Sequence, residues 1–63
     1  MAKTNVIVKL LGEDGNAFAI LGKVRKALDK AGYKEEAKSY MKEAIMGDYD
    51  HLLRVTAEYV EVE

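Results

Sequence analysis

The sequence predicts a small α+β domain with the element order β-α-α-α-β, in which two terminal antiparallel strands pack against three short helices. β-branched residues crowd together near the start of the chain, and valines alternate with glutamates in its last residues, EYVEVE. Between them lie three segments whose apolar residues recur at helical spacing. The 63 residues suffice for a single domain, residues 1–63. A core this small is expected to rely on close helix packing or on self-association.

The first strand is predicted over residues 4–11, TNVIVKLL. Its alternation places Val6, Val8 and Leu10 on one face. The opposite face is half apolar, so we expect that it is covered as well or that it contacts a partner. Gly15 is expected to supply the turn that follows, because glycine adopts positive φ without steric cost. Asn16 or Asp14 then caps the next helix.

The first helix is predicted over residues 16–31. Gly22 lies inside it, and we expect this glycine to admit a neighbouring backbone, since Phe18 and the apolar residues around it indicate a helix covered on nearly all sides. Gly32 follows as a left-handed C-terminal cap. The apolar stripe comprises Ala17, Ile20, Leu21, Val24, Ala27, Leu28 and Ala31.

A second helix is predicted over residues 34–46. Glu35 and Glu36 lie in its first turn, where negative charge favours the positive end of the helix dipole. Gly47 is expected to end this helix with a positive φ, as Gly32 ends the first. The predicted apolar stripe comprises Ala37, Tyr40, Met41, Ala44 and Ile45.

Asp48 is predicted to cap a third, shorter helix. The change from helix to strand is expected between residues 54 and 58, because the residues there suit either state. The second strand is then expected around residues 59–62, beside the first and antiparallel to it. The inner face of the third helix is predicted to comprise Tyr49, Leu52, Leu53 and Thr56.

Composition restricts the classes of function. The chain has no cysteine, which excludes disulfides, thiolate zinc sites and iron–sulfur clusters. It has no run of about 18 apolar residues and no signal-peptide pattern, so we expect a cytoplasmic protein without a membrane partner. Residues 1–34 carry seven basic and three acidic side chains, whereas residues 35–63 carry three and eight. Opposite charges of this kind favour association between the halves or between copies.

Two segments contain residue types that occur in binding or catalytic sites, but neither has the arrangement that such a site requires. The junction GEDGNAFAILG joins strand to helix, but its glycines lack the spacing of a phosphate loop or of a dinucleotide fingerprint. The segment GDYDH holds Asp48, Asp50 and His51, and adjacent positions on a helix seldom converge on one ion. Helix capping is the favoured interpretation of these aspartates, and we predict no cofactor, metal or catalytic residue.

One basic helix face is a candidate binding surface, formed by Lys23, Arg25, Lys26 and Lys30 of the first helix. Such a face can meet phosphates or an acidic partner. However, Asp29 interrupts it and no aromatic residues interleave with the cations. A solvated helix face is therefore favoured over a binding role.

The segments GEDGNAFAILG, the AGY turn at residues 31–33, the stretch 40–44 and GDYDHLL together give the chain a family resemblance. It resembles a family of small prokaryotic and phage-borne proteins that has no established function. The likeness covers nearly the whole chain. It implies an accessory or binding role and transfers no activity.

Function is therefore predicted from architecture. The leading hypothesis is a non-enzymatic interaction module that forms a homodimer and binds an unknown protein partner. Small size and two open strand edges favour it. The alternative is a nucleic-acid-associated protein that uses the basic face of the first helix. A small hydrolase or metal protein centred on Asp48, Asp50 and His51 is the least favoured hypothesis.

Overall fold

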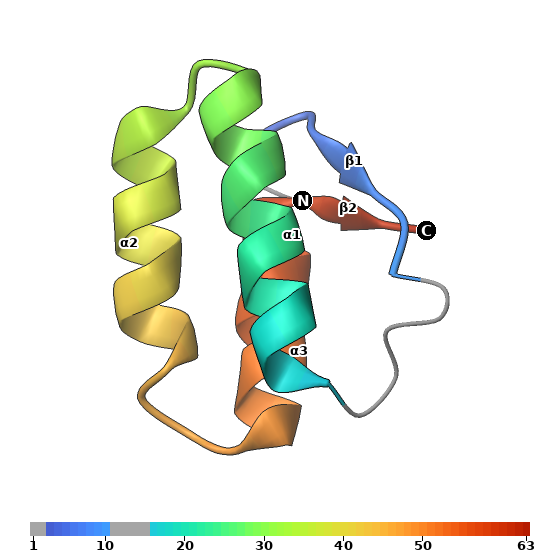
Figure 1. The fold of residues 1–63 in the computed structure, drawn as a ribbon, viewed down its shortest axis with the longest axis vertical. Helices are drawn as coiled ribbons and strands as arrows, with labels where there is room; N and C mark the ends of the chain where they lie inside the picture. Colours follow the sequence, from blue (N-terminus) through green and yellow to red (C-terminus); the bar gives the residue numbers. More distant parts are fainter. Residues whose placement is uncertain (1–2, 11–15) are drawn as a thin grey trace.

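The computed structural model describes residues 3–10 and 16–63, and in that part of the chain it contains five elements (Figure 1). They are β1 (Ile7–Val8), α1 (Ala17–Lys30), α2 (Lys34–Ala44), α3 (Tyr49–Tyr59) and β2 (Glu61–Val62). The predicted α+β class and the order β-α-α-α-β are confirmed. In Figure 1, α1 and α2 lie side by side, α3 lies behind α1, and the two strands lie at one side of the helices.

The two strands are parallel, so the prediction of an antiparallel pair is wrong. Ile7 pairs with Glu61 and Val8 with Val62. The cause is the last turn of α3, where Lys3 N–H donates to the Glu58 carbonyl at 2.7 Å. Because the N-terminal segment starts beside the end of α3, it and β2 leave the same point in the same direction. The three helices provide the long crossover that a parallel pair requires.

Two helix caps are as predicted. The Asn16 side chain accepts the Ala19 N–H at 3.1 Å and starts α1, and the Asp48 side chain accepts the His51 N–H at 3.0 Å and starts α3. Each bond satisfies one of the backbone donors that the first turn of a helix leaves free. Gly15, the predicted turn residue, lies outside the described residues.

The predicted positive φ is confirmed at Gly32, which has φ +91°, and is wrong at Gly47. The second helix ends at Ala44, so Gly47 belongs to the link before α3 and not to the helix cap. Glycine at position 47 makes room for the His51 ring, because a Cβ there would lie 2.6 Å from Cγ of His51. The imidazole occupies that space, and its Nε2 lies 2.8 Å from the Glu43 carbonyl at the end of α2.

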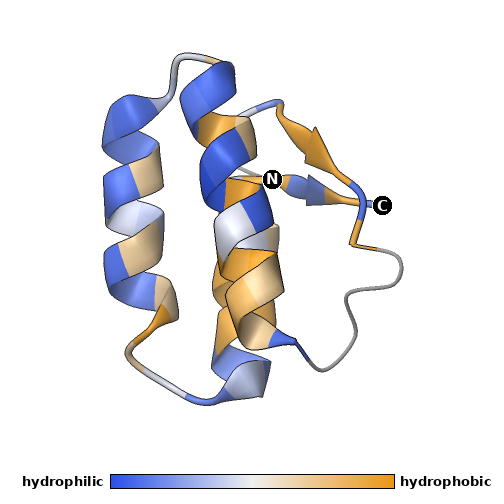
Figure 2. Cartoon of the chain, in the orientation of Figure 1, coloured by the Kyte–Doolittle hydropathy of each residue, from blue (hydrophilic) through white to orange (hydrophobic). Residues whose placement is uncertain are grey.

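The core lies between the three helices and the inner face of the strands. Figure 2 shows the outer side of α2 as hydrophilic and its α1-facing side as more apolar. Tyr59 was expected in the second strand, but it ends α3 and is buried. Its ring meets that of Tyr40 edge to face, with centroids 5.6 Å apart. The buried apolar residues are Val8, Ile20, Leu21, Val24, Leu28, Ala37, Tyr40, Ala44, Leu52, Val55, Tyr59 and Val60.

Four residues predicted to pack inside are exposed, namely Phe18, Ala31, Ile45 and Leu53. Phe18 is 88% exposed and Ile45 is 63% exposed. Ile45 follows the end of α2, so its side chain lies past the covered part of that helix. In α3, Leu53 is exposed and Val55 is buried, because the helix is turned slightly from the predicted inner face.

Replacement of Gly32 by alanine is expected to destabilise the protein by about 1 kcal/mol, because a Cβ is strained at left-handed φ. No neighbouring atom lies within 4 Å of the position that this Cβ would occupy, so the backbone conformation alone causes the loss. Urea denaturation of Gly32→Ala measures it. An unchanged free energy of unfolding would contradict the cap assigned to α1.

Gly22→Ala is expected to have the opposite effect. The sequence predicts a covered glycine that tolerates no side chain, but Gly22 is exposed and a Cβ there would meet nothing within 4 Å. Within the described part of the chain nothing covers Gly22, so the cover from which destabilisation is expected is missing there. Glycine inside a helix is about 1 kcal/mol less favourable than alanine, so Gly22→Ala should raise the free energy of unfolding by about that amount. Thermal and urea denaturation at one low protein concentration test this.

Alkaline pH is expected to weaken the fold through Tyr59. Burial, and then the hydrogen bond that its hydroxyl donates to Glu43, raise the pKa of Tyr59 above 10.0, although Lys3 opposes the shift. The folded state therefore holds the phenol proton more tightly than the unfolded state. This contribution to stability is complete below pH 10 and is lost as pH rises through the folded pKa. Stability should thus fall more steeply above pH 10 in the natural chain than in Tyr59→Phe, and parallel curves would contradict the assignment.

Candidate interaction surface

The four basic residues predicted as a binding surface are all exposed on α1, but they do not share one face. Lys23, Lys26 and Lys30 follow one another at spacings of three and four and so lie on one stripe. Arg25 lies about 100° or more around the helix from each of them, because each residue turns the helix by about 100°. The four predicted residues therefore form two separate surfaces: the three lysines lie on one stripe of α1, and Arg25 lies on the side of α1 next to α2.

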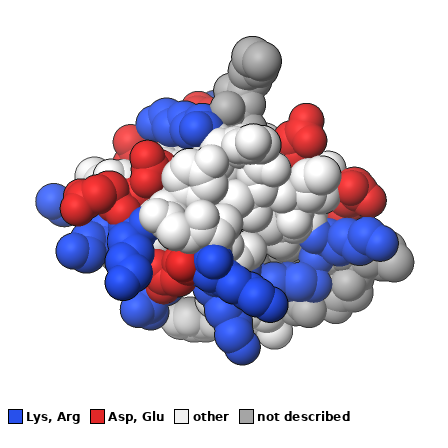
Figure 3. Space-filling model, turned by 90° about the horizontal axis from the view of Figure 1, so that it is seen from above, with Lys and Arg blue, Asp and Glu red and all other residues white. Residues whose placement is uncertain are grey.

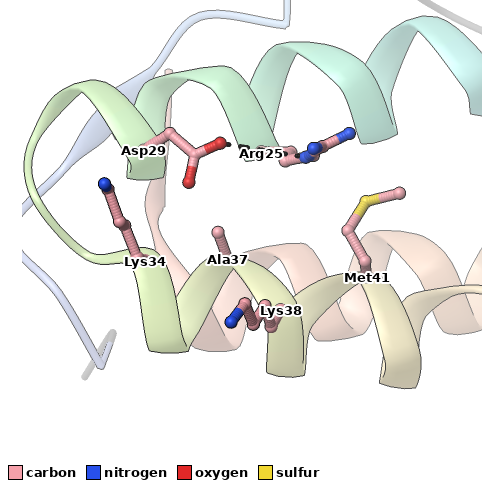
Figure 4. Close-up of a pocket in the computed structure, with 6 residues that line it drawn as sticks. All are labelled: Arg25, Asp29, Lys34, Ala37, Lys38 and Met41. Atoms are coloured by element: carbon pink, nitrogen blue, oxygen red, sulfur yellow. Dashed lines mark ion pairs between the residues drawn. The ribbon is translucent and has the colours of Figure 1, made fainter.

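Arg25 lines an open pocket of about 650 Å³ between α1 and α2 (Figure 4). Ala37 and Met41 project from α2 towards α1 and form its apolar floor, with Ala37 buried and Met41 half-buried. Charged side chains surround this floor. The lining residues are Arg25 and Asp29 from α1 and Lys34, Ala37, Lys38 and Met41 from α2.

The charges of the pocket are unbalanced. Three cations, Arg25, Lys34 and Lys38, share it with one carboxylate, that of Asp29. Nε of Arg25 lies 3.8 Å from Oδ2 of Asp29, and both side chains are largely exposed. An exposed i, i+4 pair of this kind contributes only about 0.3–0.5 kcal/mol, so the guanidinium can leave it at little cost. The pocket combines an apolar floor with available positive charge.

The two lining residues of α1, Arg25 and Asp29, belong to a longer stripe of residues spaced by four, three and four. Phe18, Gly22, Arg25 and Asp29 follow this spacing, which places them on one side of the helix. The same spacing joins Lys34, Lys38 and Met41 of α2 with Ile45, the residue that follows the last turn of this helix. Since α1 and α2 lie side by side and run in opposite directions, Phe18 and Ile45 lie towards the same end (Figure 1). We call these residues and Ala37 the α1–α2 face.

Sequence reasoning identifies only Arg25 of this face as a binding residue. It assigns Phe18 to the core and Met41 to packing, and it gives no role to Lys34 and Lys38. The signal that was available is the regular spacing of Phe18, Gly22 and Arg25, which separates them from the buried stripe of α1.

The segment GDYDH forms no comparable site. Asp48 caps α3, Asp50 is exposed in its first turn, and the His51 ring contacts the carboxyl end of α2. Among residues 3–10 and 16–63, no three His, Cys, Asp or Glu side chains are grouped so that they could hold a metal ion. None of the helices in this described part has the length and apolar character needed to cross a membrane.

Comparisons add no relative: no family model, curated protein or solved structure matches this chain. The resemblance to small prokaryotic and phage-borne proteins therefore stays a prediction.

Proposed function

We propose that this protein is a non-enzymatic interaction module of the cytoplasm that binds a protein through its α1–α2 face. The observation that carries the proposal is the pocket whose apolar floor, Ala37 and Met41, is bordered by Arg25, Lys34 and Lys38. An apolar centre with a polar rim is the usual build of a protein interface, and arginine is enriched there.

Two exposed apolar residues on the α1–α2 face support the same function. Phe18 is more exposed than any other large apolar residue in the described part of the chain, and Ile45 is also largely exposed. Neither contributes a buried side chain to the core. Exposed apolar side chains that share one face with a pocket and with polar groups mark interaction sites more often than singly scattered ones do.

Nucleic-acid binding is the second candidate, because α2 adds Lys34 and Lys38 to the cations of α1. Two observations weigh against it. Asp29 lies within the pocket, where it would repel a phosphate. Figure 3, which looks onto the end of the molecule that carries the α1–α2 turn, shows acidic groups between the basic ones around an uncharged area. A continuous basic field, as nucleic acid favours, is missing from that view.

The experiment compares two variants with the same change of charge. Arg25→Glu/Lys38→Glu replaces two cations of the α1–α2 face with carboxylates. Lys23→Glu/Lys30→Glu makes the same change of charge on the lysine stripe of α1. The tagged chain and both variants are used as bait, and captured proteins are quantified. We expect the first variant to lose its specific partners and the second to retain them. Equal capture by all three chains would contradict the proposal.

Nucleic acid is tested with the same proteins. Fluorescence anisotropy with labelled DNA and RNA oligonucleotides at low and moderate salt detects phosphate binding, whose affinity falls steeply with salt. We expect no salt-dependent binding. Tight binding that Lys23→Glu/Lys30→Glu abolishes would favour the second candidate.

A further inference from the structure

We propose that a second copy of this chain occupies the α1–α2 face. In this dimer the two α1 helices cross near Gly22 about a two-fold axis, and each Phe18 enters the pocket of the other copy. The inference rests on the proposed function and names the partner of the same face.

Gly22 is the first argument. It lies in the interior of α1, where glycine is about 1 kcal/mol less favourable than alanine. It does not have a positive φ, and a Cβ there would meet nothing within 4 Å. Nothing within the described part of the chain therefore uses its small size. Glycine permits the close approach of another backbone, and a second helix crossing at this point would use it.

The positions of Phe18 and Arg25 are the second argument. Phe18 precedes Gly22 by four residues and Arg25 follows it by three, which places them roughly 6 Å and 4.5 Å from Gly22 along the helix axis. In an antiparallel crossing near Gly22, Phe18 of one copy therefore reaches the level of Arg25 of the other. A two-fold axis makes the contact reciprocal, so one protruding ring and one pocket on each copy are sufficient.

The chemistry of the pocket suits a phenyl ring. Arg25, Ala37 and Met41 line it, and its volume of about 650 Å³ is ample for such a side chain. A guanidinium stacks favourably on an aromatic face, and a thioether sulfur makes favourable contacts at a ring edge. The loose pairing of Arg25 with Asp29 leaves the guanidinium free to do so.

Charge is the third argument. The two ends of α2 differ in net charge. At the amino end Lys34 and Lys38 are balanced by Glu35 and Glu36, whereas the carboxyl end of α2 and the start of α3 are net acidic, with Lys42, Glu43, Asp48 and Asp50. A parallel arrangement of two copies would place the two acidic ends together, and an antiparallel arrangement keeps them apart. Charge therefore favours the antiparallel, two-fold arrangement.

Sedimentation equilibrium over a hundredfold concentration range tests the dimer. The natural chain is expected to pass from monomer to dimer mass, whereas Gly22→Leu and Phe18→Ser are expected to remain monomers with unchanged helical circular dichroism. Lys23→Leu and Ile7→Ser are matched controls at exposed positions away from the face, and they should dimerise like the natural chain. A natural chain that stays monomeric, or a Gly22→Leu protein that dimerises normally, would overturn the proposal.

Disulfide trapping tests the geometry, because the chain has no cysteine of its own. Phe18→Cys and Met41→Cys are prepared as separate proteins and mixed under mild oxidation. A disulfide between the two different proteins forms readily if each Phe18 enters the other pocket. A mixture of Ile7→Cys and Met41→Cys is the control. Equal yields from both mixtures would overturn the proposed geometry.

The two proposals fail in different ways. If the chain is monomeric but Arg25→Glu/Lys38→Glu loses a captured protein, the second copy is wrong and the interaction module stands. If the chain is monomeric and capture is unaffected, both are wrong.

Discussion

Tyr59→Ala is expected to remove nearly all of the stability of this protein. Tyr59 is 2% exposed and its ring packs edge to face on Tyr40. Its hydroxyl donates to Oε2 of Glu43 at 3.0 Å, and Nζ of Lys3 lies 4.4 Å from the ring centroid. Replacing a buried aromatic residue with alanine costs about 3–5 kcal/mol. A domain of this size has roughly 3–5 kcal/mol in total, so the variant should be largely unfolded.

Tyr59→Phe is the control for this prediction. It keeps the ring in the core and removes only the hydrogen bond to Glu43, which costs about 1 kcal/mol. Urea denaturation followed by far-ultraviolet circular dichroism measures both variants. A Tyr59→Ala protein that unfolds within about 1 kcal/mol of the natural chain would show that the ring is not central to the core.

The helices could be predicted from the sequence because their determinants are local. Asn16 and Asp48 cap the helices that follow them, and the buried stripe of α1 has the predicted spacing. The end of α3 could not be predicted in this way. Tyr59 belongs to an alternating segment typical of a strand, but it remains helical, since its side chain packs on Tyr40 of α2.

The direction of the strands also depends on contacts between distant parts of the chain. It is decided where Thr4 meets the end of α3, since Oγ1 of Thr4 donates to the Tyr59 carbonyl at 2.7 Å. Thr4 and Tyr59 are far apart in the sequence, and no local pattern reports their contact. An alternating segment predicts that a strand exists but not which neighbour it follows.

The candidate surface was only partly predictable for a related reason. Charge identified Arg25, but a pocket formed by two helices requires their relative position, which brings Lys34 and Met41 opposite it. Phe18 and Gly22 do not stabilise the fold of the single chain. Phe18 is a large apolar side chain that is exposed, and Gly22 weakens the helix in which it lies without making room for a neighbour. Residues that conflict with local rules tend to mark functional positions, and both lie on the α1–α2 face.

The last prediction concerns the buried hydrogen bonds between α2 and α3. The Tyr40 hydroxyl and Oγ1 of Thr56 lie 2.8 Å apart, and Oγ1 of Thr56 also donates to the Leu52 carbonyl at 2.8 Å. A threonine hydroxyl has one proton to donate. That proton is used on Leu52, so Tyr40 is the donor to Thr56.

Because Tyr40 donates and Thr56 accepts, removing one hydroxyl should cost a different amount of stability from removing the other. In Tyr40→Phe the Thr56 hydroxyl keeps its bond to Leu52, and the loss should be about 0.5–1.5 kcal/mol. In Thr56→Val the buried Tyr40 hydroxyl keeps its proton but has no acceptor, which costs about 1–3 kcal/mol. Thr56→Val should therefore be the more damaging change. In the double variant no hydroxyl is left unsatisfied, so its loss should be smaller than the sum of the two single losses. Urea denaturation of all four proteins completes the cycle, and a greater loss in Tyr40→Phe than in Thr56→Val would reverse the direction of this hydrogen bond.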